Sequence, residues 1–210
     1  MIAFELRRAL RIVCLGAHPD DIEIGCGGTL IKLFAHEGAT VRALVLTGDG
    51  VRAAEARQAL PRFCPGADVE VTGLPDGRLP AHWSAVKDAM EDFARRGGAD
   101  LVFAPRGDDA HQDHRLIGTL TPTVWRDALI FHYEIPKWDG DLATPSHYVP
   151  LDRPTGRRKV ELLNRSFPSQ LGRDWWDDEL FVGLLRLRGV EARAPYAEGF
   201  HVAKAVVDLG

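Results

Sequence analysis

The chain has 210 residues, of which 45% are hydrophobic and 27% are charged. This balance is typical of a soluble globular protein and excludes a disordered chain or a fibrous repeat. The length suits one domain and is short for two of ordinary size, so we expect a single domain over residues 1–210. The formal net charge is -4 at pH 7, so no overall positive field would attract nucleic acid or an anionic membrane. A small molecule is therefore the expected partner.

The sequence also predicts a cytoplasmic location without a membrane span. No apolar run reaches the ~18 residues that cross a bilayer, and the apolar run 12–17 is shorter than a signal-peptide core and is broken by a His-Pro pair. Cys14, Cys26 and Cys64 are an odd number without metal-site spacing, so reduced thiols are expected. Cys26 is open to two interpretations, a reactive thiol or a buried structural cysteine, and the second is favoured because no activating partner stands beside it.

Strands and helices alternate along the first part of the chain. Continuous apolar runs, typical of strands buried on both faces, cover residues 10–17, 40–47 and 100–104, and residues 68–72 are predicted to form a further strand. Helical periodicity lies between them, at residues 28–36 (closed by Gly38), 53–63 and 83–96. This order predicts a Rossmann-like α/β fold, with a mainly parallel sheet and helices on both faces.

The pattern weakens in the last third of the chain. A helix over 116–128 and a strand over 129–135 continue the alternation. Residues 136–154 hold four of the 13 prolines and are predicted to form a long surface connection. After it, the patterns predict helices over 156–167 and 175–187 and a closing strand over 199–207.

The first cluster of chemistry-bearing residues follows the first strand directly. It reads Ala17-His18-Pro19-Asp20-Asp21-Ile22-Glu23, and ligands of open α/β sheets bind at the carboxyl ends of strands. Pro19 disfavours a helical backbone at His18, so an extended turn is expected to present these side chains. Imidazole and carboxylate are ordinary zinc ligands, while a second carboxylate can stay unbound and take a proton from water.

The second cluster follows the strand over 100–104. It contains His111, Gln112, Asp113 and His114. The two histidines are three residues apart, so on a starting helix they share one face, where one can bind metal while the other meets substrate. Together with His18 and an aspartate, one of them gives two histidines and one aspartate with an open position for water, which is the arrangement of a catalytic zinc site.

Each cluster alone has a plainer interpretation. A His-Pro-Asp-Asp sequence by itself is more often a turn whose aspartate caps the next helix, and Asp113 can be such a cap as well. The two together are stronger, because both follow predicted sheet strands, where their side chains can converge.

With both motifs the chain resembles the zinc-dependent N-deacetylases of the LmbE or PIG-L type, which act on N-acetylglucosaminyl compounds. The resemblance rests on Ala17–Glu23 and His111–His114, and it covers nearly the whole chain. Supporting similarities are Arg52-Ala53-Ala54-Glu55-Ala56, Pro75-Asp76-Gly77-Arg78-Leu79, Ser169-Gln170 and Tyr196-Ala197-Glu198-Gly199-Phe200. The chain departs from many members at Gln112, where they carry proline, and in a short segment 48–51 before Arg52.

The resemblance implies an N-deacetylase that releases acetate and a free amine from an amino-sugar compound. His18, Asp21 and His114 would hold one zinc ion. Asp20 would be the base, and His111 would be either a second acid or an oxyanion partner. Asp113 would orient His111, and Arg52 would contact the substrate. Some relatives form oligomers, so the resemblance also permits a homo-oligomer.

Two rival functions stay open at this point. One is a nucleotide-binding α/β protein without hydrolytic activity, which the fold class alone permits. The other is a metal-dependent hydrolase of another bond, such as a phosphoester, although two metals are usual there. The indoles of Trp138, Trp175 and Trp176 likewise have two interpretations, stacking on a sugar ring or covering the core.

Overall fold

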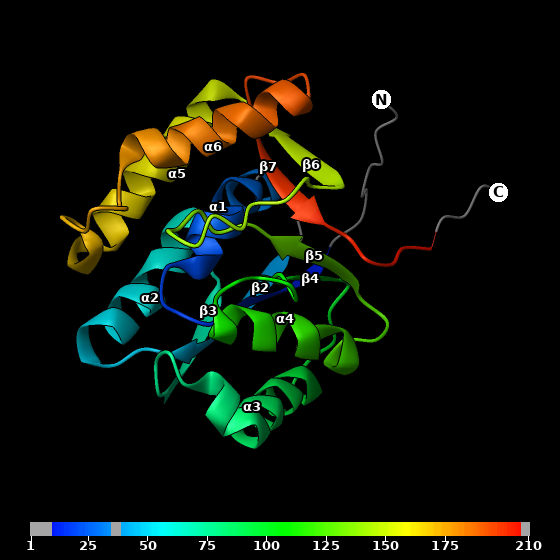
Figure 1. The fold of residues 1–210 in the computed structure, drawn as a ribbon. Helices are drawn as coiled ribbons and strands as arrows, with labels where there is room; N and C mark the ends of the chain where they lie inside the picture. The colour runs from blue at the N-terminus through cyan, green and yellow to red at the C-terminus, as the bar shows by residue number, and fades with distance from the viewer. Residues whose placement is uncertain (1–9, 35–38, 207–210) are drawn as a thin grey trace.

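The computed structural model describes residues 10–34 and 39–206 and shows one sheet between two layers of helices (Figure 1). The seven strands have the order β3-β2-β1-β4-β5-β7-β6. Strands β1 to β5 are parallel, and β7 is antiparallel to both β5 and β6. Their bounds are β1 Arg11–Gly16, β2 Thr40–Thr47, β3 Asp68–Leu74, β4 Leu101–Pro105, β5 Leu129–Tyr133, β6 His147–Leu151 and β7 Tyr196–His201.

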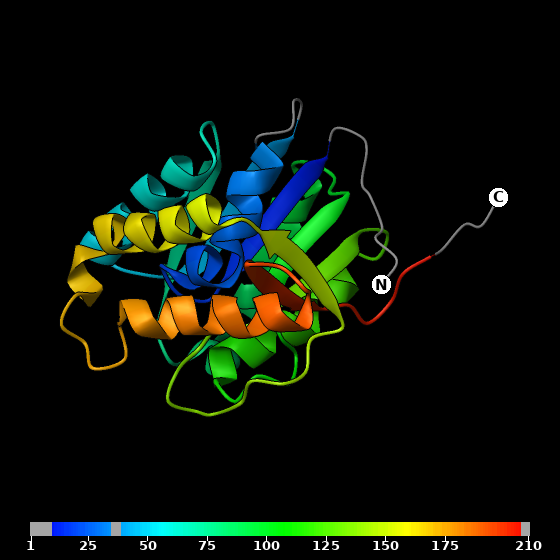
Figure 2. The same cartoon turned by 90° about the horizontal axis from the view of Figure 1, so that it is seen from above.

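The helices cover both faces of the sheet, so the expected α/β fold is confirmed. Four helices share one large apolar core: α1 Asp21–Phe34, α2 Gly50–Phe63, α5 Arg153–Ser166 and α6 Asp178–Glu191. Helices α3 Trp83–Arg95 and α4 Gln112–Val124, with the short 3-10 turn η1 Leu79–His82, cover the other face. Figure 2 shows α5 and α6 running side by side across the molecule. A second short turn, η2 Pro168–Gln170, follows α5.

Strand β1 shows why the apolar runs form central strands. Its side chains alternate between the two cores: Ile12 and Cys14 pack in the first, and Val13 and Leu15 in the second. Both faces are buried from Ile12 to Gly16, so these positions are apolar, whereas Arg11 at the start of the strand is exposed.

Helix α1 starts earlier than its periodicity predicted, at Asp21 rather than at Gly28. The glycines of this segment lie inside the helix, where neighbouring side chains pack directly against the helix backbone. A Cβ at Gly25 would lie 2.3 Å from the Tyr133 ring, and one at Gly28 would lie 2.4 Å from Leu151. The expected helix end at residues 35–38 lies outside the described residues.

The C-terminal part differs from expectation in two places. Residues 136–154 were predicted as a surface connection, but they contain β6, which pairs with β7. Pro150 is tolerated there because β6 is the edge strand of the sheet. The closing strand starts at Tyr196 instead of Gly199, and residue 207 lies outside the described residues.

Glu198 of β7 binds the backbone of α1 inside the core. Its carboxylate accepts hydrogen bonds from the backbone N–H groups of Gly28 and Thr29, at 2.8 and 2.6 Å. Lys159 of α5 donates to Glu198 at 2.6 Å and to the carbonyl oxygen of Ile24 at 2.5 Å. Both side chains are buried. The Tyr196–Phe200 element is thus a structural anchor for the helix that carries Asp21.

The three cysteines are free and buried. Burial raises the pKa of the Cys26 thiol well above its usual range, so the structural interpretation of this residue is favoured. Among residues 10–34 and 39–206, no helix is long and apolar enough to cross a membrane.

Tyr133→Phe is expected to lower the free energy of unfolding by about 1–2 kcal/mol. The Tyr133 hydroxyl is fully buried and donates to the carbonyl oxygen of Leu15 at 2.6 Å, beside the loop that follows β1. Phenylalanine fills the same space but leaves that bond unmade. Urea unfolding measures the difference, and a midpoint equal to that of the wild type would show that the bond is not stabilising.

Candidate metal centre and active site

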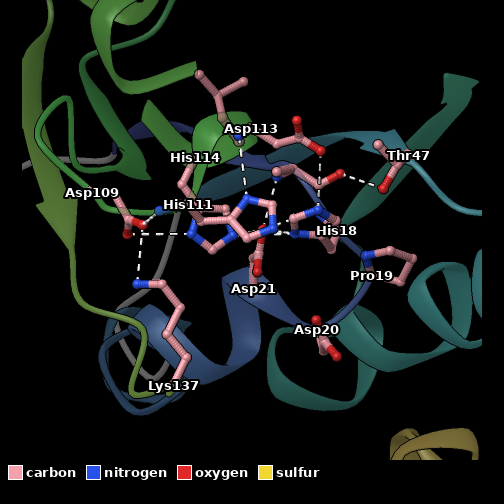
Figure 3. A network of polar contacts seen from close by, with 12 residues as sticks. His18, Pro19, Asp20, Asp21, Thr47, Asp109, His111, Asp113, His114 and Lys137 are labelled. Atoms are coloured by element: carbon pink, nitrogen blue, oxygen red, sulfur yellow. Dashed lines mark hydrogen bonds and ion pairs between the residues drawn. The ribbon is translucent and has the colours of Figure 1, made fainter. Parts of the chain in front are cut away.

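The two motifs meet at the carboxyl ends of β1 and β4, as Figure 3 shows. These strands are neighbours, although β2, β3 and four helical segments separate them in the chain. The connections from β1 and β4 run to opposite sides of the sheet, which creates the crevice where α/β proteins bind ligands. The expected convergence of the motifs is therefore present.

Three atoms from the two motifs converge closely. His18 Nδ1 lies 3.1 Å from His114 Nε2. Asp21 Oδ2 lies 3.5 Å from His18 Nδ1 and 3.2 Å from His114 Nε2. Ligands at 2.0–2.2 Å from a tetrahedral zinc ion stand about 3.3–3.6 Å from one another. The set therefore has the chemistry and nearly the spacing of three zinc ligands.

The turn after β1 places these atoms. The N–H groups of Ala17 and His18 both donate to Asp21 Oδ2, at 2.9 and 2.8 Å, and Asp21 opens α1. Thr47, at the end of β2, donates to the carbonyl oxygen of Ala17 from its hydroxyl and its backbone. Asp20 has a φ of 112°, which a residue with a side chain rarely adopts. Such strain costs of order 1–3 kcal/mol and is held by the surrounding contacts.

Carboxylates stand behind both of the converging histidines. His18 Nε2 lies 3.1 Å from Asp76 and 3.4 Å from Asp113. His114 Nδ1 lies 3.2 Å from Asp109. A carboxylate on one ring nitrogen orients the ring and leaves the other nitrogen as the ligand atom.

Asp113 contacts His111 differently from the expectation. Its backbone N–H, rather than its carboxylate, donates to His111 Nδ1 at 3.2 Å. The carboxylate accepts from the N–H groups of Gly77 and Leu79, at 2.8 and 3.0 Å, and faces His18. Asp113 therefore joins the loop after β3 to the metal candidates, and its side chain orients His18.

His111 is the N-cap residue of α4, so it lies just before the helix, and His114 lies in the first turn. The ring centroid of His111 lies 4.8 Å from that of His18 and 4.7 Å from that of His114. His18, His111 and His114 each have one ring nitrogen within 4.8 Å of a nitrogen of the other two rings. His111 could therefore replace Asp21 as the third metal ligand.

Asp20 lies apart from the three converging atoms, on the side of Arg52. Its buried carboxylate is 3.3 Å from Nη2 of Arg52, which also donates to the carbonyl oxygen of Pro19 at 3.0 Å. Nη1 of Arg52 reaches Asp76 at 3.4 Å. Two carboxylates that could otherwise pair with Arg52 near the surface have other partners: Glu55 accepts from Ser169, and Glu70 accepts from Arg96. Arg52 thus faces the candidate site.

The electrostatics of the site favour a cation. Burial lowers the pKa of His114, but the Asp21 and Asp109 carboxylates outweigh it and raise that pKa to about 9. Burial likewise opposes the charge on His18, yet neighbouring carboxylates, led by Asp21, raise its pKa well above the usual value. A divalent ion between the two rings would replace these protons, so the donor set fits such an ion.

The pKa values of Asp20 and His111 shift in opposite directions in the same environment. Burial raises the pKa of Asp20 to about 7, with the charge of Arg52 opposing this and that of Asp21 adding to it. Burial, together with the charges of His114 and His18, lowers the pKa of His111.

Three residues of the site carry no signal in the sequence: Asp76, Asp109 and Lys137. Asp76 lies inside the Pro75–Leu79 similarity without an assigned role, Asp109 lies two residues before His111, and Lys137 lies in the expected surface connection. Each approaches the site from a separate loop at the carboxyl edge of the sheet. Trp176, by contrast, is buried against Phe167 and Phe181 and covers the core, whereas Trp138 is exposed.

The family model described as GlcNAc-PI de-N-acetylase, PIG-L, matches residues 13–125, just over half of the chain. The chain belongs to this family. Both motifs lie within the matched residues. Membership makes the chain an amide hydrolase of the amino-sugar N-deacetylase type, and it does not favour the nucleotide-binding and phosphoester alternatives.

Two similar proteins illustrate the family. A protein of Escherichia coli strain K12, the uncharacterized deacetylase YaiS, is 30% identical over 141 residues, covering 54% of this chain and 75% of its own length. The 1D-myo-inositol 2-acetamido-2-deoxy-alpha-D-glucopyranoside deacetylase of Rhodococcus erythropolis is 28% identical over 202 residues, covering 76% of this chain and 67% of its own length.

Solved structures share the fold. The conserved protein TT1542 of Thermus thermophilus aligns over 95% of this chain and 97% of its own, with a TM-score of 0.73 and 25% identity. The N,N'-diacetylchitobiose deacetylase of Pyrococcus horikoshii aligns over 91% of this chain and 83% of its own, with a TM-score of 0.72 and 21% identity.

Proposed function

We propose that the protein removes the acetyl group from an N-acetylglucosaminyl-type compound and releases acetate and a free amine. The observation that carries the proposal is the convergence of His18, Asp21 and His114, with Asp20, Arg52 and His111 around them. The names of relatives support an amino-sugar substrate, since the Streptomyces fradiae protein that is 30% identical over 142 residues is a 2'-N-acetylparomamine deacetylase.

His18, Asp21 and His114 would hold one divalent ion, for which zinc is proposed because nitrogen and carboxylate donors both suit it. When bound, zinc supplies Lewis-acid polarisation of the amide carbonyl and lowers the pKa of water towards ~7. The protein's part is to hold the donors in place. The carboxylates of Asp113 and Asp109 do this from behind the two imidazoles.

Asp20 is proposed as the base that takes the proton from the attacking water. Its carboxylate lies on the Arg52 side of the site and is not one of the three ligand atoms, and Nη2 of Arg52 lies 3.3 Å from one of its oxygens. Asp20 is also held in a rare backbone conformation, with a φ of 112°. A base restrained in this way needs little reorganisation when the proton moves.

His111 is proposed to stabilise the oxyanion as the amide carbon becomes tetrahedral. Its Nδ1 accepts a hydrogen bond from the Asp113 backbone. In the neutral ring the proton is therefore on Nε2, which makes this atom a donor. To protonate the departing amine instead, His111 would have to be the imidazolium, and the burial and neighbouring charges that lower its pKa favour the neutral ring and the oxyanion role.

Arg52→Lys is expected to lower kcat/KM by about tenfold, since one charge-assisted hydrogen bond contributes about 1.5–3 kcal/mol. Lysine keeps the charge but loses the fork that spans Asp20 and Asp76 and is proposed to reach the substrate. Zinc content and the melting temperature are expected to stay near those of the wild type. Steady-state kinetics on a confirmed N-acetyl sugar provide the measurement. Unchanged kinetics would remove Arg52 from the site.

The proposed function itself is tested by an amine-release screen. Purified zinc-loaded protein is assayed against a panel of N-acetylglucosaminyl compounds, with phosphoester compounds as a second panel. Release of amine and acetate in equal amounts is expected from at least one amino sugar. Activity only on phosphoesters, or activity that survives complete removal of metal, would overturn the proposal. Cytoplasmic location and homo-oligomer formation stay predictions.

A further inference from the structure

Behind His114, a chain of charged contacts continues past the Asp109 carboxylate to two residues without a role in the proposed reaction. Asp109 Oδ2 lies 3.2 Å from His114 Nδ1, and Asp109 Oδ1 lies 3.0 Å from Lys137 Nζ. Lys137 continues to both carboxylate oxygens of Asp141, at 2.8 and 2.9 Å. Figure 3 shows Asp109 between the histidine ring and the ammonium group of Lys137.

The contacts join two segments that are distant in sequence. Asp109 belongs to the connection from β4 to α4, which carries His111, whereas Lys137 and Asp141 belong to the connection from β5 to β6. Two further hydrogen bonds join the same segments. Asp141 accepts from the N–H of Ala110 through its carboxylate and from Arg106 through its carbonyl oxygen, both at 2.8 Å. Residues 137–141 are therefore fastened along the β4–α4 connection.

Burial makes this arrangement sensitive to the loss of any member. The side chain of Asp109 is 3% exposed and that of Lys137 is 9% exposed. An ionised carboxylate that loses its partner in such a place is costly and shifts or rearranges. Without Lys137, the Asp109 carboxylate loses the contact that holds Oδ1, and its Oδ2 is less firmly directed at His114.

We propose that Asp109 and Lys137 are positioning residues that set the metal affinity through His114 and couple it to the β5–β6 connection. The inference rests on the proposed metal site. Asp109 orients the His114 ring so that Nε2 points to the ion, and Lys137 holds Asp109 in the required rotamer. By linkage, an ion that stiffens His114 and Asp109 also stabilises the position of residues 137–141.

The test compares the zinc dissociation constants of Asp109→Asn and Lys137→Met with that of the wild type, by competition with a chromophoric chelator. Loss of a carboxylate behind a metal-binding histidine typically weakens binding about 10–100-fold. We expect this for Asp109→Asn and a change in the same direction for Lys137→Met. Lys137→Arg, which keeps the charge, is expected to bind zinc more tightly than Lys137→Met.

Lys87→Met is the matched control. Lys87 is also a partly buried lysine in an ion pair, with Glu91 at 3.0 Å, but it lies on α3, away from the site. The zinc affinity of the Lys87→Met variant is expected to equal that of the wild type. Circular dichroism establishes that each variant is folded, and Asp109→Asn, which is isosteric, carries the test if Lys137→Met does not fold.

Hydrogen exchange supplies a readout that a purely structural role would not move. Zinc is expected to slow exchange over residues 137–141 in the wild type and to do so less in Lys137→Met. If the wild type binds zinc and both variants bind it equally well, this inference is wrong and the proposed function stands. If the wild type itself binds no zinc, the proposed metal site fails first.

Discussion

His114→Ala is expected to remove most of the bound metal and to reduce kcat/KM by roughly a thousandfold or more. Nε2 of His114 is the atom closest to both other proposed ligands, at 3.1 and 3.2 Å, so its loss leaves a two-ligand site. The metal's contribution to the transition state is several kcal/mol, and each 1.36 kcal/mol is tenfold in rate. Metal content after dialysis and steady-state kinetics provide the measurements.

Three further variants sharpen this test. His147→Ala changes a histidine on the edge strand β6 and is expected to leave the metal content unchanged. Asp21→Asn and His111→Ala decide between the two candidate third ligands. We expect Asp21→Asn to lose metal and His111→Ala to keep it while losing turnover. The reverse pattern would replace Asp21 by His111 in the ligand set, and full metal occupancy with normal activity in His114→Ala would refute the site.

Asp20→Asn is expected to keep the metal and to lose about 10²–10⁴-fold in kcat, the usual scale for general acid–base catalysis. Asparagine has the same shape and still accepts a hydrogen bond from Arg52, but it cannot take a proton from water. Metal analysis and steady-state kinetics on the same preparation separate the two effects.

Asp76→Asn is the comparison for this prediction. Asp76 also contacts Arg52, so the variant removes a neighbouring negative charge without removing the proposed base. A smaller loss of turnover is expected, because half or more of the Asp76 side chain is exposed and solvent screens it. If Asp20→Asn lost metal as completely as Asp21→Asn, the division between base and ligand would be wrong. Equal kinetic losses in Asp20→Asn and Asp76→Asn would assign the effect to charge alone.

The buried parallel strands were predictable because their burial dictates composition. A strand covered on both faces, such as β4 or β1 after Arg11, is apolar along its buried length, and this leaves a continuous run in the sequence. The start of α1 was not predictable in the same way. Gly25 and Gly28 suggest a loop by local propensity, and only contact with Tyr133 and Leu151 explains glycine inside this helix.

The residues proposed for the chemistry were visible because they occur in short, contiguous motifs after such strands. His18, Asp20 and Asp21 are neighbours in the chain, as are His111 and His114, and the turn and the first helical turn present them together. The contacts that hold these residues in place could not be predicted from the sequence. The contacts of Asp113 with Gly77 and Leu79, and of Asp109 with Lys137, join residues from different loops, so no local pattern announces them.

Local patterns were enough to predict the α/β class, the two motifs and their places at strand ends, because hydrophobic periodicity and turn chemistry are properties of neighbouring residues. Three features could be seen only in the folded chain: β1 lies beside β4, β7 and β6 extend the sheet with antiparallel pairing, and the Asp113 carboxylate faces His18. These depend on how the sheet is ordered and on which loops meet at its carboxyl edge. Such contacts join residues far apart in the chain and are selected by packing of the whole core, which leaves no periodic signal in the segments that make them.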